Sequence, residues 1–211
     1  SGGTESVNLG ITGLFRARRN AQPSRVRILA TAAEHHAALD TLEWLEKHEG
    51  ALIDWIPVDA NARVDVDALE AALRREPESI ALVTSLWANN EVGTIQPVAE
   101  ISSLARDAGI PLHVDAVAVW GHEPIDLRDL PGVSALSVSG HKVGSVPGVG
   151  ALFVSRTAAI EPLIHGGGQQ RGLRSGTQDV PAAVSMAAAI DEALAQRASE
   201  EERLGALRDD C

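Results

Sequence analysis

The chain has 211 residues, of which 45% are hydrophobic and 3% aromatic, and its formal net charge is −11. This is enough apolar material for one large core, or for a large and a small lobe. The acidic balance argues against nucleic acid as a partner, because phosphate binding needs a basic surface. No apolar run approaches the roughly 20 residues that cross a bilayer, and no signal peptide is visible, so we expect a cytoplasmic protein with no membrane partner.

The first segment, Ser1–Ser6, is rich in glycine and leads into a helical pattern with Val7, Ile11 and Leu14 on one face. Glycines before a helix, with Thr4 as a capping hydroxyl, leave backbone amides pointing at one place. That place suits a phosphate. From these residues alone, an ordinary capped helix is the more common explanation.

Strands alternate with helices through the first 155 residues. This pattern predicts an α/β fold with three layers, in which a mostly parallel sheet lies between helices. The expected strands are 25–31, 52–58, 80–86, 111–116, 135–139 and 151–155. Between them we expect helices that begin near Glu34, at Asp65 and before Ile101.

Polar residues lie at or just after the ends of three of these strands, where the ligands of α/β sheets usually bind. His35 begins a helix, so its imidazole is either a cap or a packed side chain, or it lies flat against a flat cofactor. Asn90 belongs to a polar cluster after the third strand. Asp115 ends a short apolar strand, and burying its carboxylate requires a partner: a cationic ring nitrogen, an arginine or a metal. His113 would share a face with Asp115, but no third ligand is near in sequence, so we expect no metal site.

Lys142 is one of only two lysines, and its surroundings differ from those of Lys47. Lys47 has polar neighbours, as a solvated lysine does. Lys142 follows the apolar strand and Ser139–His141, and a glycine-rich loop almost without charge comes after it. A lysine in apolar surroundings can act as an amine nucleophile, and an incidental surface lysine is the alternative.

The last third of the chain divides into a loop and a helix. Residues 165–177 are polar and glycine-rich, and loops of this kind usually carry function or meet a partner chain. From Pro181 on, Ala183, Ala187, Ile190 and Leu194 lie on one face of a long amphipathic helix. We therefore expect a large domain over residues 1–180 and, over 181–211, a helix that leads toward a small C-terminal domain.

Six motifs occur together along nearly the whole chain, and their order and spacing resemble those of the cysteine desulfurases of the NifS/IscS type. These are pyridoxal-phosphate enzymes of fold type I, related to the class V aminotransferases. The motifs are Ser1-Gly2-Gly3-Thr4-Glu5-Ser6, Glu34-His35-His36, Asn89-Asn90-Glu91, His113-Val114-Asp115-Ala116, Ser139-Gly140-His141-Lys142 and Arg174-Ser175-Gly176-Thr177.

The resemblance implies catalytic roles for three residues. Lys142 would hold pyridoxal phosphate covalently, and Asp115 would pair with its ring nitrogen, which keeps the ring an electron sink. His35 would stack on the ring and move protons. Asn90 would lie beside the ring hydroxyl.

The resemblance also implies a phosphate site and a homodimer. Thr4, Ser139 and His141, with the backbone around Gly3, would hold the phosphate. Thr177 would reach the phosphate of a neighbouring subunit, which makes a homodimer part of the site.

The reaction of this family converts L-cysteine to L-alanine and leaves the sulfur on an enzyme cysteine as a persulfide. A sulfur-acceptor protein and iron–sulfur cluster biogenesis belong to the same expectation. The chain departs from the pattern at Ala118, where the family has a glutamine. The only cysteine, Cys211, does not match the sulfur-accepting position. Since the chain also opens with Ser1, we expect a fragment, truncated at both ends, that carries the cofactor half of the site.

Two alternatives remain open from the sequence. The first is another class V enzyme, such as a selenocysteine lyase or an aminotransferase. The second is a non-catalytic paralogue that keeps the fold and acts as an interaction module, which Ala118 would favour.

Overall fold

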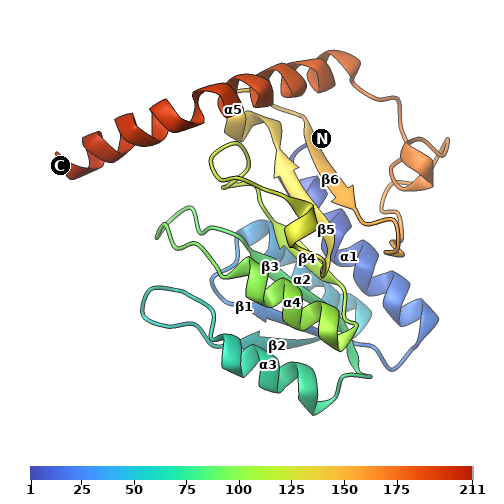
Figure 1. Ribbon diagram of the computed structural model, residues 1–211. Coiled ribbons are helices and arrows are strands. Elements are labelled where there is room, and N and C mark those ends of the chain that lie inside the picture. The colour runs from blue at the N-terminus through green and yellow to red at the C-terminus, as the bar shows by residue number, and fades with distance from the viewer. Residues whose placement is uncertain (211) are drawn as a thin grey trace.

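A computed structural model describes residues 1–210, and it contains one six-stranded sheet in the order β2-β1-β3-β4-β5-β6 (Figure 1). The first five strands of this order run parallel, and β6 is antiparallel to β5. The strands are β1 (Arg27–Thr31), β2 (Leu52–Ile56), β3 (Ile80–Leu86), β4 (Leu112–Asp115), β5 (Val133–Ser139) and β6 (Gly150–Val154).

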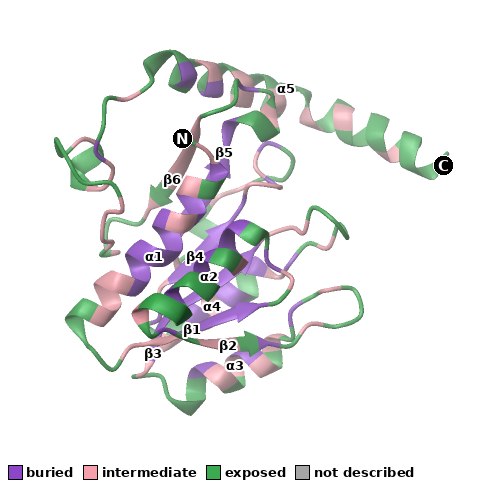
Figure 2. Ribbon diagram, turned by 180° about the vertical axis from the view of Figure 1, so that it is seen from behind, coloured by how far each residue is buried: buried purple, intermediate pink, exposed green. Residues whose placement is uncertain are grey.

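Helices cover both faces of the sheet, so the predicted three-layer α/β fold is confirmed. Helices α1 (Gly3–Ala21) and α2 (His36–Glu49) pack on one face, and α3 (Val66–Arg75) and α4 (Val98–Ala108) on the other. Along β1, Ile28 faces α1 and α2, whereas Leu29 faces α3 and α4. The central strands are buried on both sides, as Figure 2 shows, which explains why β3 is apolar or small at nearly every position.

The predicted elements agree with the structure to within a few residues, and two local expectations are wrong. Thr4 lies inside α1, and the N-cap is Gly2, which makes no side-chain capping hydrogen bond. The last helix, α5 (Val180–Asp209), presents Ala182 and Met186 to the core, whereas the expected face at Ala183 and Ala187 is exposed. The buried face is shifted by one residue from the expected one. The sequence of this helix is rich in alanine, so several of its faces are almost equally apolar.

Helix α5 is long and only its first part packs against the sheet domain. Its N-terminal half contacts the 3-10 turn η2 (Gly140–Val143), and Figure 1 shows its C-terminal half extending away from the other elements. Leu204 and Leu207 lie on this extension with about half of their surface exposed. No helix in residues 1–210 combines the length and the apolar character that a membrane span requires.

The chain changes direction within the sheet at β1. It runs from β1 to β2 on one side, and then returns to β3 on the other side of β1. At such a switch point the two connections diverge, and a crevice forms beyond the carboxyl ends of the strands. The segments that follow β1, β3 and β4 therefore border one opening.

Helix α1 crosses the sheet so closely that one of its positions has no room for a side chain. A Cβ atom at Gly10 would lie 2.4 Å from the Cδ2 atom of His113. The imidazole cannot easily move, because Thr84 Oγ1 and Ser137 Oγ each lie 2.9 Å from one of its ring nitrogens. Burial lowers the pKa of His113 to about 3, so this ring is a neutral core side chain, and both of its nitrogens are occupied.

The close approach of α1 predicts opposite effects of two Gly→Ala substitutions. Gly10→Ala should lower the free energy of unfolding by about 1–2 kcal/mol, because overpacking outweighs the gain in helix propensity. Gly205→Ala is the matched control, since a Cβ there meets nothing within 4 Å, and it should be neutral or stabilising. Urea denaturation of both variants measures this, and equal stabilities would contradict the close packing.

Candidate functional site

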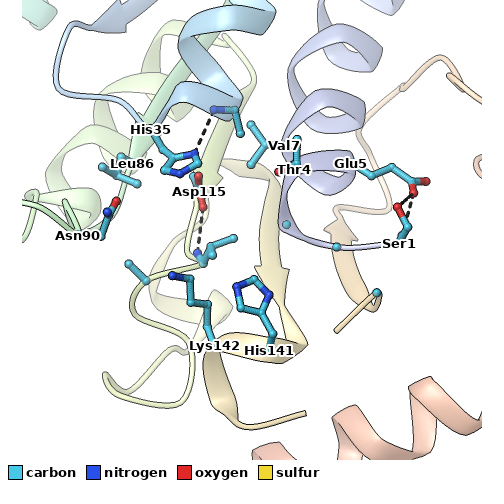
Figure 3. A pocket seen from close by; sticks show the side chains of 16 residues that line it. Ser1, Thr4, Glu5, Val7, His35, Leu86, Asn90, Asp115, His141 and Lys142 are labelled. Carbon is cyan, nitrogen blue, oxygen red and sulfur yellow. Dashed lines mark hydrogen bonds and ion pairs between the residues drawn. The ribbon is translucent and has the colours of Figure 1, made fainter. Parts of the chain in front are cut away.

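The residues beyond the carboxyl ends of the strands enclose a cavity of about 400 Å³ (Figure 3). It lies at the switch point between β1 and β3, and side chains from five different segments reach it. Seven of the nine predicted cofactor-binding residues line this cavity: Gly3, Thr4, His35, Asn90, Asp115, His141 and Lys142. Ser139 lies directly beneath two of them, and Thr177 lies elsewhere.

Asp115 is a nearly buried carboxylate at the end of β4, with 2% of its surface exposed. Its Oδ1 accepts a hydrogen bond of 2.9 Å from the amide of Val117. Burial raises the pKa of Asp115, and the bond from Val117 and the nearby His35 oppose this rise. Within residues 1–210, no basic side chain forms an ion pair with it. The cavity therefore presents a carboxylate that a cationic ligand would stabilise.

His35 combines two of the roles that the sequence left open. It is the N-cap of α2, and its Nδ1 accepts a hydrogen bond of 3.0 Å from the amide of Ala37. Because Nδ1 is an acceptor here, the neutral ring carries its proton on Nε2. Figure 3 shows the ring beside Asp115 in the cavity. A proton that His35 exchanges with a ligand must therefore pass through Nε2.

The first turn of α1 forms the opposite end of the cavity. The amide of Gly3 donates to Ser139 Oγ over 3.2 Å, and this hydroxyl lies 2.9 Å from Nδ1 of His141. The N-cap, Gly2, supplies no side-chain acceptor, and the amides of a first helical turn have no intrahelical acceptor. Amides of this kind, together with the helix dipole, favour an anion.

Lys142 lies at the mouth of the cavity, on the short turn η2 that follows β5. Its side chain is exposed, so the expected apolar surroundings are wrong: β5 ends before the lysine, and the following loop does not cover it. This loop is fastened to α5, because Ser185 Oγ accepts hydrogen bonds from the Ser145 hydroxyl at 3.1 Å and from the Val146 amide at 3.2 Å. The turn that carries Lys142 is thus held by β5 on one side and by α5 on the other.

Two neighbouring asparagines after β3 have different tasks. Asn89 is structural: its Nδ2 donates to the carbonyl of Ala33 over 2.9 Å and so joins the segments that follow β3 and β1. Asn90 is exposed and lines the cavity. Ala118 also lines it and brings no polar group, in accordance with the departure noted from the sequence.

Thr177 does not reach this cavity in the single chain. It lines a second one of about 710 Å³, between α1, β6, the loop before α5 and α5 itself. Glu5 borders both cavities and binds Arg174 through hydrogen bonds of 2.8 and 3.2 Å. The role of Thr177 at a neighbouring subunit stays a prediction.

Two acids whose roles the sequence does not reveal make specific contacts in the structure. Glu5 forms the ion pair just described, and Glu34 is buried between β1 and β3. An acid three residues after the end of an apolar strand was a signal for Glu34. Among residues 1–210, no group of three or more potential ligands is arranged to hold a metal ion.

Comparison with known proteins gives a consistent result. The family model "Aminotransferase class-V" matches residues 1–205. An IscS-like cysteine desulfurase of Mycobacterium tuberculosis is 49% identical over 99% of this chain and 53% of that protein. The cysteine desulfurase IscS of Dictyoglomus turgidum is 42% identical over 99% of this chain and 51% of its own length. The chain therefore spans about half the length of these relatives.

Solved structures show the same similarity. A NifS-like protein superposes with a TM-score of 0.89 and 35% identity over 100% of this chain and 56% of its own. A structure described as SspA in complex with cysteine has a TM-score of 0.81 and 35% identity, over 90% of this chain and 53% of its own.

His35 both caps α2 and lines the cavity, and we expect that substitutions can remove the imidazole from the cavity with or without loss of the cap. His35→Ala should lower the free energy of unfolding by about 1 kcal/mol, because α2 loses its cap, whereas Asn retains a capping acceptor and should cost little. Thermal unfolding of the two variants in parallel measures the difference. If both variants are equally destabilised, the hydrogen bond to Ala37 does not stabilise the helix.

Proposed function

Because this chain belongs to the class-V aminotransferase family, we propose that it is the pyridoxal-phosphate-binding part of a cysteine desulfurase. The whole protein would convert L-cysteine to L-alanine and pass the sulfur to one of its own cysteines. The names of the curated relatives support this activity, and so does the neighbour solved with cysteine. The family resemblance that the six motifs predicted is confirmed.

The observation that carries the proposal is the opposite character of the two ends of the cavity. One end is a buried carboxylate without a cationic partner in the described residues, and the other is the first turn of α1. Pyridoxal phosphate has a ring nitrogen that can be cationic and a phosphate that is anionic, so its two ends match. Gly3 lets the first turn of α1 lie close against the cavity wall, because a Cβ there would lie 3.0 Å from Val117 and 3.1 Å from Ser139.

Each predicted residue then has a specific task at this ligand. Asp115 would hold the positive charge of the ring nitrogen, and Lys142 would hold the cofactor through its amine. His35 would lie against the ring and exchange protons at Nε2. When bound, the cofactor supplies an electron sink for the bonds at the substrate α-carbon.

The phosphate end would be built from backbone and hydroxyl groups. The first turn of α1, with Gly3 and Thr4, would bind the phosphate oxygens together with His141, and Ser139 would hold the phosphate site by positioning Gly3 and His141. Because Ser139 Oγ accepts from the Gly3 amide, its own proton is available for Nδ1 of His141. His141 would then carry its proton on Nε2 and donate it to the phosphate.

The remaining expectations belong to the same proposal. Asn90 would lie at the ring hydroxyl, where Ala118 cannot contribute a hydrogen bond. Thr177 would complete the phosphate site of a second copy in a cytoplasmic homodimer. Residues 1–180 would form most of the large domain, and α5 would lead toward the part of the protein that carries the sulfur-accepting cysteine. The sulfur would pass to an acceptor protein, as iron–sulfur cluster biogenesis requires.

The proposal predicts that one of the two lysines holds the cofactor. The protein reconstituted with pyridoxal phosphate should absorb near the edge of the visible range, and borohydride should fix the cofactor to the peptide that contains Lys142. Lys142→Ala should lose both signals, whereas Lys47→Ala, in the exposed part of α2, should keep them. A colourless protein after reconstitution would contradict the proposal.

The activity of the whole protein distinguishes the proposed reaction from its relatives. With L-cysteine and a thiol reductant, we expect equal amounts of alanine and sulfide, with no requirement for a keto acid. His35→Asn should reduce this rate by 10²-fold or more, a magnitude typical of a lost acid–base group. A requirement for a keto acid would indicate an aminotransferase, and a preference for selenocysteine would indicate a selenocysteine lyase. The absence of turnover would indicate a non-catalytic paralogue.

A further inference from the structure

Glu34 is a buried acid beneath the cavity, and half of its carboxyl group is unpartnered. The residue is 6% exposed and lies in the short connection between β1 and α2. Its Oε1 accepts hydrogen bonds from the amide of Leu86 at 2.9 Å and from the hydroxyl of Thr31 at 3.2 Å. Its Oε2 is buried and has no hydrogen-bond partner in residues 1–210.

The two partners of Oε1 belong to different strands. Thr31 is the last residue of β1, and Leu86 is the last residue of β3. These are the strands between which the chain changes direction, and Leu86 itself lines the cavity. The carboxyl group of Glu34 therefore holds the two strand ends together at the floor of the site.

We propose that Glu34 is a positioning residue of the cofactor site: a neutral carboxylic acid that fixes the ends of β1 and β3 and leaves the buried negative charge to Asp115. This inference rests on the proposed function as far as the cofactor is concerned. The neutral state of Glu34 rests on the fold alone.

The surroundings explain why Glu34, rather than Asp115, is the group that keeps a proton. Asp115 borders the open cavity, accepts the Val117 amide and has His35 beside it. Glu34 lies deeper, and no basic side chain of residues 1–210 forms an ion pair with it. Burial raises its pKa to about 8, the bond from Leu86 lowers it, and the negative charge of Asp115 raises it further. Two buried carboxylates that repel each other titrate as a pair, and the less solvated one retains the proton.

A neutral Glu34 has a consequence for the ligand. The carboxylate of Asp115 can balance one cationic ring nitrogen, whereas a second buried negative charge, on Glu34, would have no cationic partner on the ligand. Ionisation of Glu34 would also weaken the floor of the site, because the desolvated charge favours opening of the strand ends to water. The cofactor site should therefore change as the pH rises through about 8.

Infrared spectroscopy tests the protonation state in the intact protein without added cofactor. At pH 7 we expect the C=O stretch of a protonated carboxylic acid, which shifts in heavy water, is absent from Glu34→Gln and disappears above about pH 8. Glu5→Gln is the matched control, because bonds from Arg174 hold the pKa of Glu5 at about 2, so its removal should leave this band unchanged. If Glu34→Gln removes no such band, the proposal is overturned, whether or not the protein binds pyridoxal phosphate.

A stability titration gives a second, independent readout. Glutamine keeps an oxygen for Leu86 and Thr31 and is always neutral. An acid whose pKa rises from 4.5 to about 8 on folding makes the folded state less stable as the pH increases through that range. The stability of Glu34→Gln relative to the unsubstituted protein should therefore increase between pH 5 and pH 8 and stay constant above. A difference that does not depend on pH contradicts a neutral Glu34.

Cofactor affinity shows whether the neutral carboxyl group of Glu34 positions the strand ends or whether its negative charge is required. At pH 7, Glu34→Gln should bind pyridoxal phosphate within about threefold of the unsubstituted protein and lose its pH dependence near 8. Glu34→Ala should bind at least tenfold more weakly, since both strand ends lose their acceptor. If the Gln variant binds as weakly as the Ala variant at pH 7, the carboxylate form is required and the proposal is wrong.

Discussion

The carboxylate of Asp115 is the constraint on which the rest of the site depends. Burying an ionised group without a partner is costly, and most proteins avoid it by pairing or by protonation. Here the described residues offer an amide and a nearby imidazole, and no ion pair. The fold maintains this arrangement because β4 is enclosed between β3 and β5, so the end of the strand cannot turn toward solvent. The sheet therefore keeps the Asp115 carboxylate buried, and a cationic ligand is favoured because it would pair with that carboxylate.

The order of the strands explains how residues distant in sequence reach the same cavity. The segments after β1, β3, β4 and β5 all leave the same edge of the sheet, and the first turn of α1 lies beside them. Hydrogen bonds between these segments set their spacing: Asn89 joins the connection after β3 to that after β1, and Ser139 joins the end of β5 to α1. The cavity is thus a property of the sheet edge rather than of one flexible loop.

Much of this arrangement could be predicted from the sequence, and what could not has physical reasons. Apolar strands ending in Asp115, and Lys142 after another strand, indicated a ligand site because parallel strands share one carboxyl edge. That Gly2 rather than Thr4 caps α1 could not be predicted, because the first turn of a helix can begin one or two residues earlier or later without any change in the apolar pattern. The exposure of Lys142 depends on what covers the loop after it. The role of Glu34 depends on the neighbour of β1 in the sheet, and strand order leaves no trace in a single sequence.

The ion pair between Glu5 and Arg174 connects the first turn of α1, where we propose that a phosphate binds, with the loop that carries Thr177. An acid in the first helical turn stabilises the helix dipole, but it also repels an anion bound to the same amides. Bonds from Arg174 hold the pKa of Glu5 at about 2, so the acid is ionised and its charge is balanced by the guanidinium. The helix end can then accept a phosphate without a neighbouring unpaired negative charge. The same contact holds the loop against α1. One pair of side chains would therefore set both the position from which Thr177 reaches a second subunit and the electrostatics of the proposed phosphate site.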